Sequence, residues 1–265
     1  MIVIGERING TRKLVGNSIQ LKNKDHVIKE AKEQTEAGAT MIDVNAGKNP
    51  SAEVEDMKWL MEIVQSNSSL PLCLDSANPK VIEAALSVNR NGRPLVNSVT
   101  DEGPRVDGMM PVIMKYEAMA VALLIDEKGV PDTVDRRLQI AGSLVPKMLK
   151  FGIKVEDIFV DPCIFPLSTN TMYGLDAAES IRKVKEMFPG IKTTCGLSNI
   201  SFGLPLRGLM NQAFVVMLML NGLDSALIDP LDKKMMSLIA ATKALLNKDD
   251  YCMDYVTAAK EGKYI

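Results

Sequence analysis

Short apolar runs rich in β-branched residues alternate along the chain with longer segments in which apolar residues recur at helical spacing. The alternation repeats eight times, which predicts eight strands, each followed by a helix. The expected strands cover residues 1–5, 40–44, 70–74, 93–98, 118–125, 157–160, 192–196 and 225–228. The expected helices cover residues 25–37, 51–67, 79–88, 104–116, 133–150, 174–188, 207–221 and 231–246. Gly38, Gly152 and Gly222 stand where helix C-caps favour glycine.

The length of the repeat distinguishes between α/β architectures. Eight units in 265 residues give about 33 residues per unit, the size of the repeat in a (β/α)8 TIM barrel. Doubly wound sheets usually have fewer strands, and their nucleotide-binding members carry a GxGxxG or GxxxxGK[ST] turn, which this sequence lacks. No linker or low-complexity tract divides the chain. We therefore predict an α/β protein folded as a single TIM-barrel domain over residues 1–265.

Composition and charge exclude several classes of function. The 31 basic and 33 acidic residues leave a formal net charge of −2, so no global field attracts nucleic acid or an anionic membrane. The four cysteines, Cys73, Cys163, Cys195 and Cys252, form no CxxC or CxxH pattern, which argues against a structural zinc site or a disulfide framework. No signal-peptide pattern or apolar run of about 18 residues is present. These features predict a cytoplasmic protein with no nucleic-acid or membrane partner.

Carboxylates and carboxamides follow seven of the eight expected strands. The loops that follow parallel strands form the site face of a TIM barrel, so these side chains are expected to share one mouth. In strand order they are Glu6 and Asn9 with Arg7, Asp43 and Asn45, Asp75 with Ser76, Asn97, Asp161, Asn199 with Ser198, and Asp229. Taken alone, each of them is explained better as a helix N-cap or a turn residue, and we interpret Asp126 and Asp229 in that way. No histidine or lysine stands at these ends, and His26 is the single histidine of the chain.

The chemistry of such a mouth leaves two interpretations open. A carboxylate accepts two parallel N–H bonds from an amidine-like edge, and a carboxamide pairs with adjacent donor and acceptor atoms. This arrangement suits the edge of an aminopyrimidinone, as found in a pterin or guanine ring. The same acids could instead hold a divalent metal ion. The residue types alone support ring recognition and metal binding about equally well.

Six motifs, in order along the chain, resemble the pterin-binding methyltransferases. They are GERING at residues 5–10, AGA at 37–39 leading into IDVN at 42–45, LCLDS at 72–76, VNS at 96–98, VDP at 160–162 and GLSNIS at 196–201. In particular, the chain resembles the methyltetrahydrofolate:corrinoid protein methyltransferases, relatives of the folate domain of cobalamin-dependent methionine synthase. The resemblance extends from Met1 to about Cys252.

The resemblance implies a pterin-binding barrel of the dihydropteroate synthase-like type, usually a homodimer. It implies methyl transfer, in either direction, between N5 of tetrahydrofolate and the cobalt of cobalamin carried by a separate corrinoid protein. No protein-bound metal is expected. Carried over by position, Asp75, Asn97 and Asp161 would bind the pterin ring, and Asn199 would be the catalytic residue near N5. Gly196 and Ser198 would shape the loop that holds Asn199, whereas Glu6, Asn9 and Asp43 would support the site from behind or pack the N-terminal region.

The implied reaction is consistent with a site that lacks histidine. A tertiary amine is a poor leaving group, so N5 needs a proton or a hydrogen bond that strengthens in the transition state. A preorganised amide such as that of Asn199 can supply the hydrogen bond without titrating. Co(I) is already a strong nucleophile, so the protein mainly has to align the two carriers and exclude water.

Two rival functions and two individual residues remain to be considered. A dihydropteroate synthase-like enzyme would carry a Ser-Arg-Lys type motif after its seventh strand, where this chain has Gly196 to Asn199 and no lysine. A non-catalytic scaffold that docks a corrinoid protein would have lost the acids and amides of the mouth. Cys195 is interpreted as a buried strand residue, and Arg207 either contacts the folate tail or caps a loop.

Overall fold

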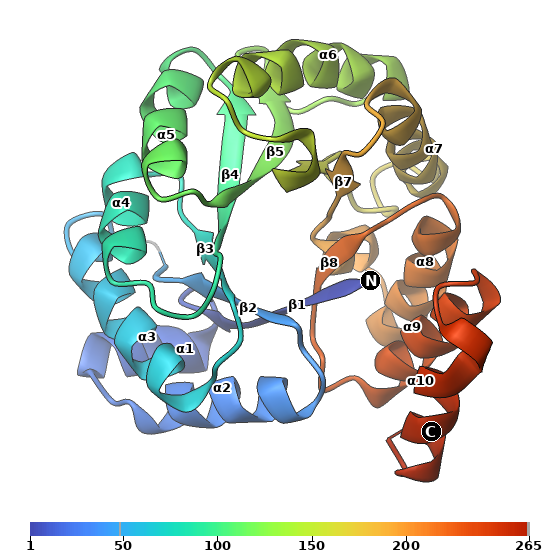
Figure 1. The fold of residues 1–265 in the computed structure, drawn as a ribbon, viewed down its shortest axis with the longest axis horizontal. Coiled ribbons are helices and arrows are strands. Elements are labelled where there is room, and N and C mark those ends of the chain that lie inside the picture. The colour runs from blue at the N-terminus through green and yellow to red at the C-terminus, as the bar shows by residue number, and fades with distance from the viewer. Residues whose placement is uncertain (48, 264–265) are drawn as a thin grey trace.

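A closed ring of parallel strands forms the centre of the molecule, and helices surround it (Figure 1). The computed structural model describes residues 1–47 and 49–263. The strands are β1 (Ile2–Asn9), β2 (Met41–Asn45), β3 (Leu72–Asp75), β4 (Leu95–Asp101), β5 (Met119–Asp126), β6 (Ile158–Asp161), β7 (Lys192–Thr193) and β8 (Ser225–Ile228). They pair in the order β7-β6-β5-β4-β3-β2-β1-β8, and a parallel bridge between Gly196 and Leu227 joins the two ends. The predicted TIM barrel is confirmed.

Within the described residues, the outer layer contains the eight predicted helices and two that were not predicted. The predicted ones are α2 (Asp25–Glu36), α3 (Glu53–Asn67), α4 (Pro79–Ser87), α5 (Pro104–Lys115), α6 (Val134–Lys150), α7 (Tyr173–Met187), α8 (Arg207–Leu220) and α9 (Lys233–Leu245). The additional ones are α1 (Lys13–Leu21) and α10 (Met253–Lys260). α1 buries only Val15, Ser18 and Ile19, so its sequence carries a short apolar signal that is easily missed. Within the described residues, no helix is long and apolar enough to cross a membrane.

Three strand ends differ from the prediction by three residues or more, and the other strand boundaries agree within two residues. β1 continues to Asn9, because its pairing with β2 resumes at Ile8 after a register shift, so Glu6 and Arg7 lie within the strand rather than after it. β4 continues to Asp101, which places Asn97 inside the strand. β7 stops at Thr193 and not at residue 196. Thr194 and Cys195 still hydrogen-bond to neighbouring strands, with Thr194 N–H donating to Val160 O and Leu227 N–H donating to Cys195 O, both at 2.9 Å.

The end of β1 is packed closely against the end of β2. A Cβ atom added at Gly10 would lie 2.7 Å from the carbonyl carbon and oxygen of Ala46 and from the nitrogen of Gly47. These are backbone atoms, so no side chain can move aside to make room. The close approach allows Gly10 N–H to donate to Asn45 O at 2.8 Å. Glycine is therefore required where β1 leads into α1.

We expect Gly10→Ala to lower the free energy of unfolding by about 1–3 kcal/mol, because the added methyl group must push two backbone segments apart. Chemical denaturation of the variant and the wild type measures the difference. Gly208→Ala is the matched control, since a Cβ atom there has only Gln212 Nε2 nearby, at 3.9 Å. Gly208 lies in α8, so alanine should leave stability unchanged or raise it. Equal stabilities of the two variants would contradict this account of Gly10.

Candidate active site at the mouth of the barrel

The alternation of side chains along the strands places polar groups directly above an apolar layer. Six residues, one from each of the strands β1 to β6, form a buried cluster inside the barrel: Ile4, Met41, Cys73, Leu95, Val121 and Phe159. Because side chains alternate between the two faces of a strand, the residue two positions later faces the same interior. Those residues are Glu6, Asp43, Asp75, Asn97, Leu123 and Asp161. Five polar side chains thus follow the apolar layer toward the carboxyl ends of the strands.

One group of these residues lies at the ends of β2, β3 and β4. Asn45 Nδ2 donates a hydrogen bond to Asp75 Oδ2 at 2.9 Å. Asp75 and Asn97 are register partners in the β3–β4 ladder, so they lie side by side. Asp43 is buried beneath them at 1% exposure, and its carboxylate accepts a hydrogen bond from the Cys73 thiol. The structure therefore brings the predicted Asp75 and Asn97 together, with Asp43 as their buried neighbour.

Burial changes the acidity of this group. Desolvation raises the pKa of Asp43 well above its usual value, and the charge of Asp75 adds to the effect. Desolvation also raises the pKa of Asp75, and the hydrogen bond from Asn45 opposes that rise. The mouth therefore holds its acids in an environment that favours ligands able to donate hydrogen bonds to them.

A second group lies at the ends of β6 and β7. Asp161 Oδ1 accepts from the N–H of Cys163 at 2.8 Å, and the carboxylate also accepts from the N–H of Gly196. Burial nevertheless raises the pKa of Asp161 to about 6. A Cβ atom at Gly196 would lie 3.1 Å from Asn199 Nδ2, so glycine gives the Asn199 side chain room. Asn199 itself is exposed to solvent, as a residue that meets a substrate must be.

The loop that carries Asn199 is a 3-10 turn, η2 (Leu197–Ser201), held by Arg207. Arg207 Nη2 donates to Ser198 O at 2.8 Å, and its Nε donates to Ser201 Oγ at 3.0 Å. Arg207 thus makes the loop-capping contact that was one of the two roles considered for it. Cys195 is fully buried, as predicted.

Glu6 and Asp229 join the mouth on the side of β1 and β8. Burial raises the pKa of Glu6 to about 7, and the charge of Asp229 contributes to the rise. Arg7 Nη1 donates to Asp229 Oδ2 at 2.7 Å, while Nη2 and Nε donate to Glu30 of α2, Nη2 at 2.9 Å. Asp229 does form a turn, accepting from Leu231 N–H at 3.0 Å, but the turn interpretation missed its ion pair with Arg7.

Asn9 and two supporting residues have more local roles. Asn9 Oδ1 accepts from the N–H and the hydroxyl of Thr11, which forms the turn that leads into α1. Glu53 of α3 accepts from the Ser76 hydroxyl at 2.5 Å, and Gln34 of α2 accepts from Arg7 N–H at 3.0 Å. Sequence reasoning missed Glu53 and Gln34 because both are helix residues more than twenty positions away from their partners.

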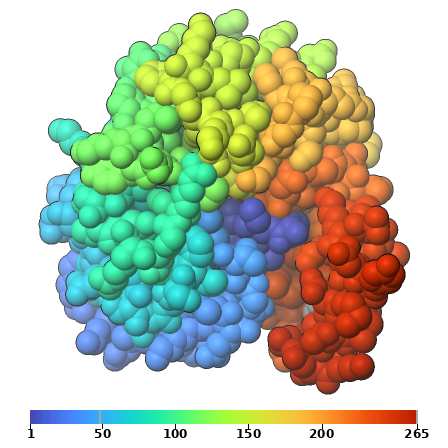
Figure 2. Space-filling model, viewed as in Figure 1, coloured from blue at the N-terminus to red at the C-terminus, as the bar shows by residue number. Residues whose placement is uncertain are grey.

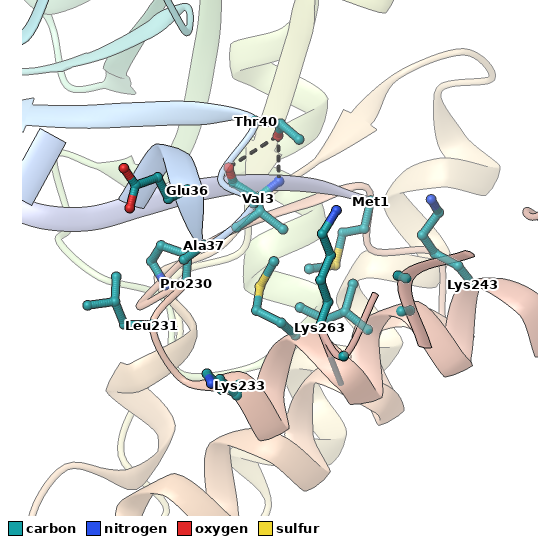
Figure 3. A pocket seen from close by; sticks show the side chains of 16 residues that line it. Met1, Val3, Glu36, Ala37, Thr40, Pro230, Leu231, Lys233, Lys243 and Lys263 are labelled. Atoms are coloured by element: carbon teal, nitrogen blue, oxygen red, sulfur yellow. Dashed lines mark hydrogen bonds between the residues drawn. The ribbon is translucent and has the colours of Figure 1, made fainter. Parts of the chain in front are cut away.

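A separate cleft of about 540 Å³ lies on the flank of the barrel (Figure 3). It is lined by residues near the start of β1, the α2–β2 turn, α9 and the region after α10, among them Met1, Gly38, Met236, Ile239 and Lys243. Figure 2 shows the start of the chain at the surface, between the N-terminal helices and the C-terminal segment. None of the predicted site residues lines this cleft, so it is distinct from the mouth.

The family of the chain follows from a match over most of its length. A family model described as a pterin binding enzyme matches residues 5–229, which include every residue of the mouth described above. The chain belongs to the pterin-binding enzyme family. Among curated proteins, methylcorrinoid:tetrahydrofolate methyltransferase from Eubacterium limosum is 40% identical over 99% of this chain and 97% of its own length. Methionine synthase from Mycobacterium tuberculosis is 33% identical over 241 residues, 86% of this chain and 20% of that protein.

Solved structures of other pterin-binding proteins share the fold. Dihydropteroate synthase from Clostridium difficile, determined in the presence of pteroic acid, superimposes with a TM-score of 0.73 at 18% identity, covering 92% of this chain and 96% of that one. The enzyme from Xanthomonas albilineans in complex with 7,8-dihydropteroate gives a TM-score of 0.72 at 16% identity, covering 92% and 93%. At these identities the similarity concerns the fold alone. The predicted relationship of this pterin-binding enzyme to folate–corrinoid methyltransferases is confirmed by its curated relatives.

Proposed function

We propose that this pterin-binding enzyme transfers a methyl group between N5 of tetrahydrofolate and the cobalt of a corrinoid carried by another protein. The observation that carries the proposal is the row of Asp75, Asn97 and Asp161 above the apolar interior layer, beside a loop that presents an exposed Asn199. Full-length similarity to a methylcorrinoid:tetrahydrofolate methyltransferase supports the assignment. The same similarity favours ring recognition over the divalent metal that residue types had left open.

The pterin ring would bind by its hydrogen-bonding edge. The N–H groups of Cys163 and Gly196 donate hydrogen bonds to Asp161 and thereby orient its carboxylate. The remaining lone pairs of the carboxylate can accept hydrogen bonds from ring N–H groups. Asp75 is oriented in the same way by Asn45. Asn97, beside Asp75, offers both a donor and an acceptor to the same ring. Preorganised acceptors of this kind lose little freedom when the ring binds.

Asn199 would act at N5. When the C–N bond breaks, electron density returns to N5, and a hydrogen bond from the Asn199 amide stabilises that charge. Gly196 leaves space for the amide, and Arg207 holds the turn that presents it. The carbonyl oxygen of Ser198 accepts the hydrogen bond by which Arg207 holds the turn. The amide need not change its protonation state, so it can serve the transfer in both directions.

The corrinoid is the second substrate in this proposal. Its cobalt supplies the nucleophile or the methyl donor, according to its oxidation state. The chain's own residues bind and orient folate at the mouth, so the corrinoid protein must dock over the same mouth. A homodimer and a cytoplasmic location are part of the proposal, as the family resemblance and the sequence features indicate.

A spectroscopic transfer assay tests the proposed function. The protein is mixed anaerobically with methyltetrahydrofolate and Co(I) cobalamin, and formation of methylcobalamin is followed by absorbance; tetrahydrofolate and methylcobalamin are then used for the reverse reaction. Transfer in either direction supports the proposal. Folate binding without transfer to free cobalamin would indicate that the enzyme requires a protein-bound corrinoid, whereas absence of folate binding would favour the scaffold alternative. Condensation of a pterin diphosphate with an aminobenzoate would favour the dihydropteroate synthase alternative, which the absence of lysine at residues 196–201 argues against.

Folate binding should weaken as the pH falls below about 6. The raised pKa of Asp161, about 6, means that its carboxylate gains a proton in this range and can then no longer accept two ring N–H bonds. Above that pH the Asp161 carboxylate is ionised, so its protonation no longer changes the affinity for folate. Calorimetric titration of tetrahydrofolate between pH 5 and pH 8 measures the effect, with roughly tenfold loss per pH unit as the limiting slope. Asp161→Asn, which cannot titrate, should lose this slope; an unchanged slope in that variant would assign it to another group.

A further inference from the structure

Arg137 of α6 is a buried cation outside the set of residues assigned above. Its side chain is only 1% exposed, although arginine is rarely buried unless it is paired. Within residues 1–47 and 49–263 Arg137 forms no salt bridge, its Nη1 has no hydrogen-bond partner, and the carboxylate that acts on it most strongly without contact is Asp176 of α7. Burial lowers the pKa of the guanidinium from its very high ordinary value. The fold therefore keeps an unpaired charge in its interior at a cost in stability.

The contacts that Arg137 does make all lead to the loop after β6. Its Nε donates to Pro162 O at 2.7 Å, and its Nη2 donates to Cys163 O at 3.4 Å. The guanidinium carbon also lies 5.8 Å from the centre of the Phe165 ring. Cys163 has a φ of 63°, in the left-handed region that is uncommon for residues other than glycine. Arg137 thus holds both carbonyls that flank this uncommon conformation.

The conformation of this loop determines how Asp161 is held. The N–H of Cys163 is the group that donates to Asp161 Oδ1, so the left-handed turn aims a donor at the carboxylate. The positive charge of Arg137 also acts on the same carboxylate and lowers its pKa. The other titratable neighbours are the thiols of Cys163 and Cys195, whose pKa values burial raises, to about 12 for Cys163. Both thiols are therefore neutral at ordinary pH, and Arg137 is the charge that acts on Asp161.

We propose that Arg137 is a positioning residue for pterin recognition: it fixes the Pro162–Cys163 turn, which aims the Cys163 N–H at the Asp161 carboxylate, and it places a positive charge beside the loop that carries this carboxylate. The inference rests on the proposed function, because it concerns how Asp161 is prepared for a pterin. It also gives a reason for retaining a buried cation without a contact ion pair, since its guanidinium holds two carbonyls of the loop that carries Asp161. Arg137 itself need not touch the ligand.

The test compares Arg137→Met, which removes the charge, with Arg137→Lys, which keeps it, and uses Arg136→Met as the matched control. Arg136 is the next residue of α6 but pairs with Asp126, away from the loop. The pKa of Asp161 is measured by NMR titration of protein labelled with 13C-aspartate, with Asp161→Asn identifying its signal. Affinity for tetrahydrofolate is measured by calorimetry at pH 6 and pH 8.

In Arg137→Met we expect the Asp161 pKa to rise and the Kd for tetrahydrofolate to increase about tenfold or more, with the larger loss at pH 6. In Arg137→Lys the Asp161 pKa should stay near that of the wild type while the Kd increases less. An unchanged Asp161 pKa and Kd in Arg137→Met, or equal changes in Arg136→Met, would overturn the proposal. If Arg137→Met does not fold, a wild-type Kd in a folded Arg137→Lys would overturn the positioning role, because lysine keeps the charge but has no Nε–H group to donate to Pro162 O. A wild-type protein that binds no tetrahydrofolate would refute the proposed function, and the titration of Asp161 would still decide whether Arg137 controls it.

Discussion

Asn199→Ala is expected to slow methyl transfer by roughly 30- to 1,000-fold, equivalent to about 2–4 kcal/mol of transition-state stabilisation, while the affinity for folate changes little. Asn199 is exposed on a turn that is held by Arg207 and not by the Asn199 side chain, so its removal leaves the loop intact. The hydrogen bond to N5 matters most when the C–N bond is breaking, so its loss lowers the rate and not the ground-state binding. Anaerobic stopped-flow measurement of single-turnover transfer to Co(I) cobalamin gives the rate, and calorimetry gives the Kd.

Asn67→Ala is a suitable control for this experiment. The Asn67 side chain donates only to Ile63 O of its own helix, at 2.8 Å, so the variant should behave as the wild type. Equal losses of binding and rate in Asn199→Ala would reassign Asn199 to ring binding. Unchanged transfer would remove it from the reaction altogether.

Asp75→Ala is expected to fail at an earlier step, the binding of folate. The ring N–H groups would enter the mouth without their acceptor, and a buried donor left without a partner costs about 2–3 kcal/mol, or roughly 30- to 150-fold in Kd. Asn45 would lose its partner as well, since Asp75 Oδ2 accepts its amide. Calorimetric titration with tetrahydrofolate at pH 8 measures the Kd directly, and rates at saturating folate measure what remains of transfer.

Asn199→Ala and Asp75→Ala should therefore have different kinetic effects, the first on the rate of transfer and the second on the affinity for folate. Asp75→Ala should recover much of its rate when folate is raised, whereas Asn199→Ala should not. Because burial raises the pKa of Asp75, its replacement should also leave the fold at least as stable at neutral pH. The sign follows from linkage: a raised pKa means that ionising the group at neutral pH costs stability, and alanine removes that cost. A wild-type Kd for Asp75→Ala would contradict the role of this carboxylate in pterin binding.

Much of the site was predictable because strand periodicity carries it. Asp75, Asn97 and Asp161 each stand two positions after an apolar residue that faces the barrel interior, so the register of the strand aims them at the mouth. The eight-fold alternation of strands and helices then predicts that these strands share one barrel. Positions that depend on a local repeating pattern were therefore found from the sequence.

The features that were missed depend on contacts between residues far apart in the chain. β1 continues past residue 5 because β2 offers it pairing partners, and no pattern within β1 encodes that. Asp229 looks like an ordinary turn residue until the fold brings it to Arg7, 222 positions away in sequence. Arg137 is a charged residue, a type that is usually exposed to solvent, and only tertiary packing buries it.

The shortness of β7 has a consequence for how this fold can change its chemistry. The ring-binding acids belong to ladders whose register holds the barrel together, so they can hardly move without disturbing it. After Thr193, however, the backbone is joined to its neighbours by individual hydrogen bonds and the Gly196–Leu227 bridge and not by a ladder, while Leu197 and Ile200 pack into the core, until α8 begins at Arg207. Insertions, deletions or new side chains at the exposed positions of this segment would leave the strand register untouched. Ring recognition can therefore be inherited unchanged while the segment between β7 and α8 diverges, so that one ancestral barrel can give rise to enzymes that bind the same ring and catalyse different reactions.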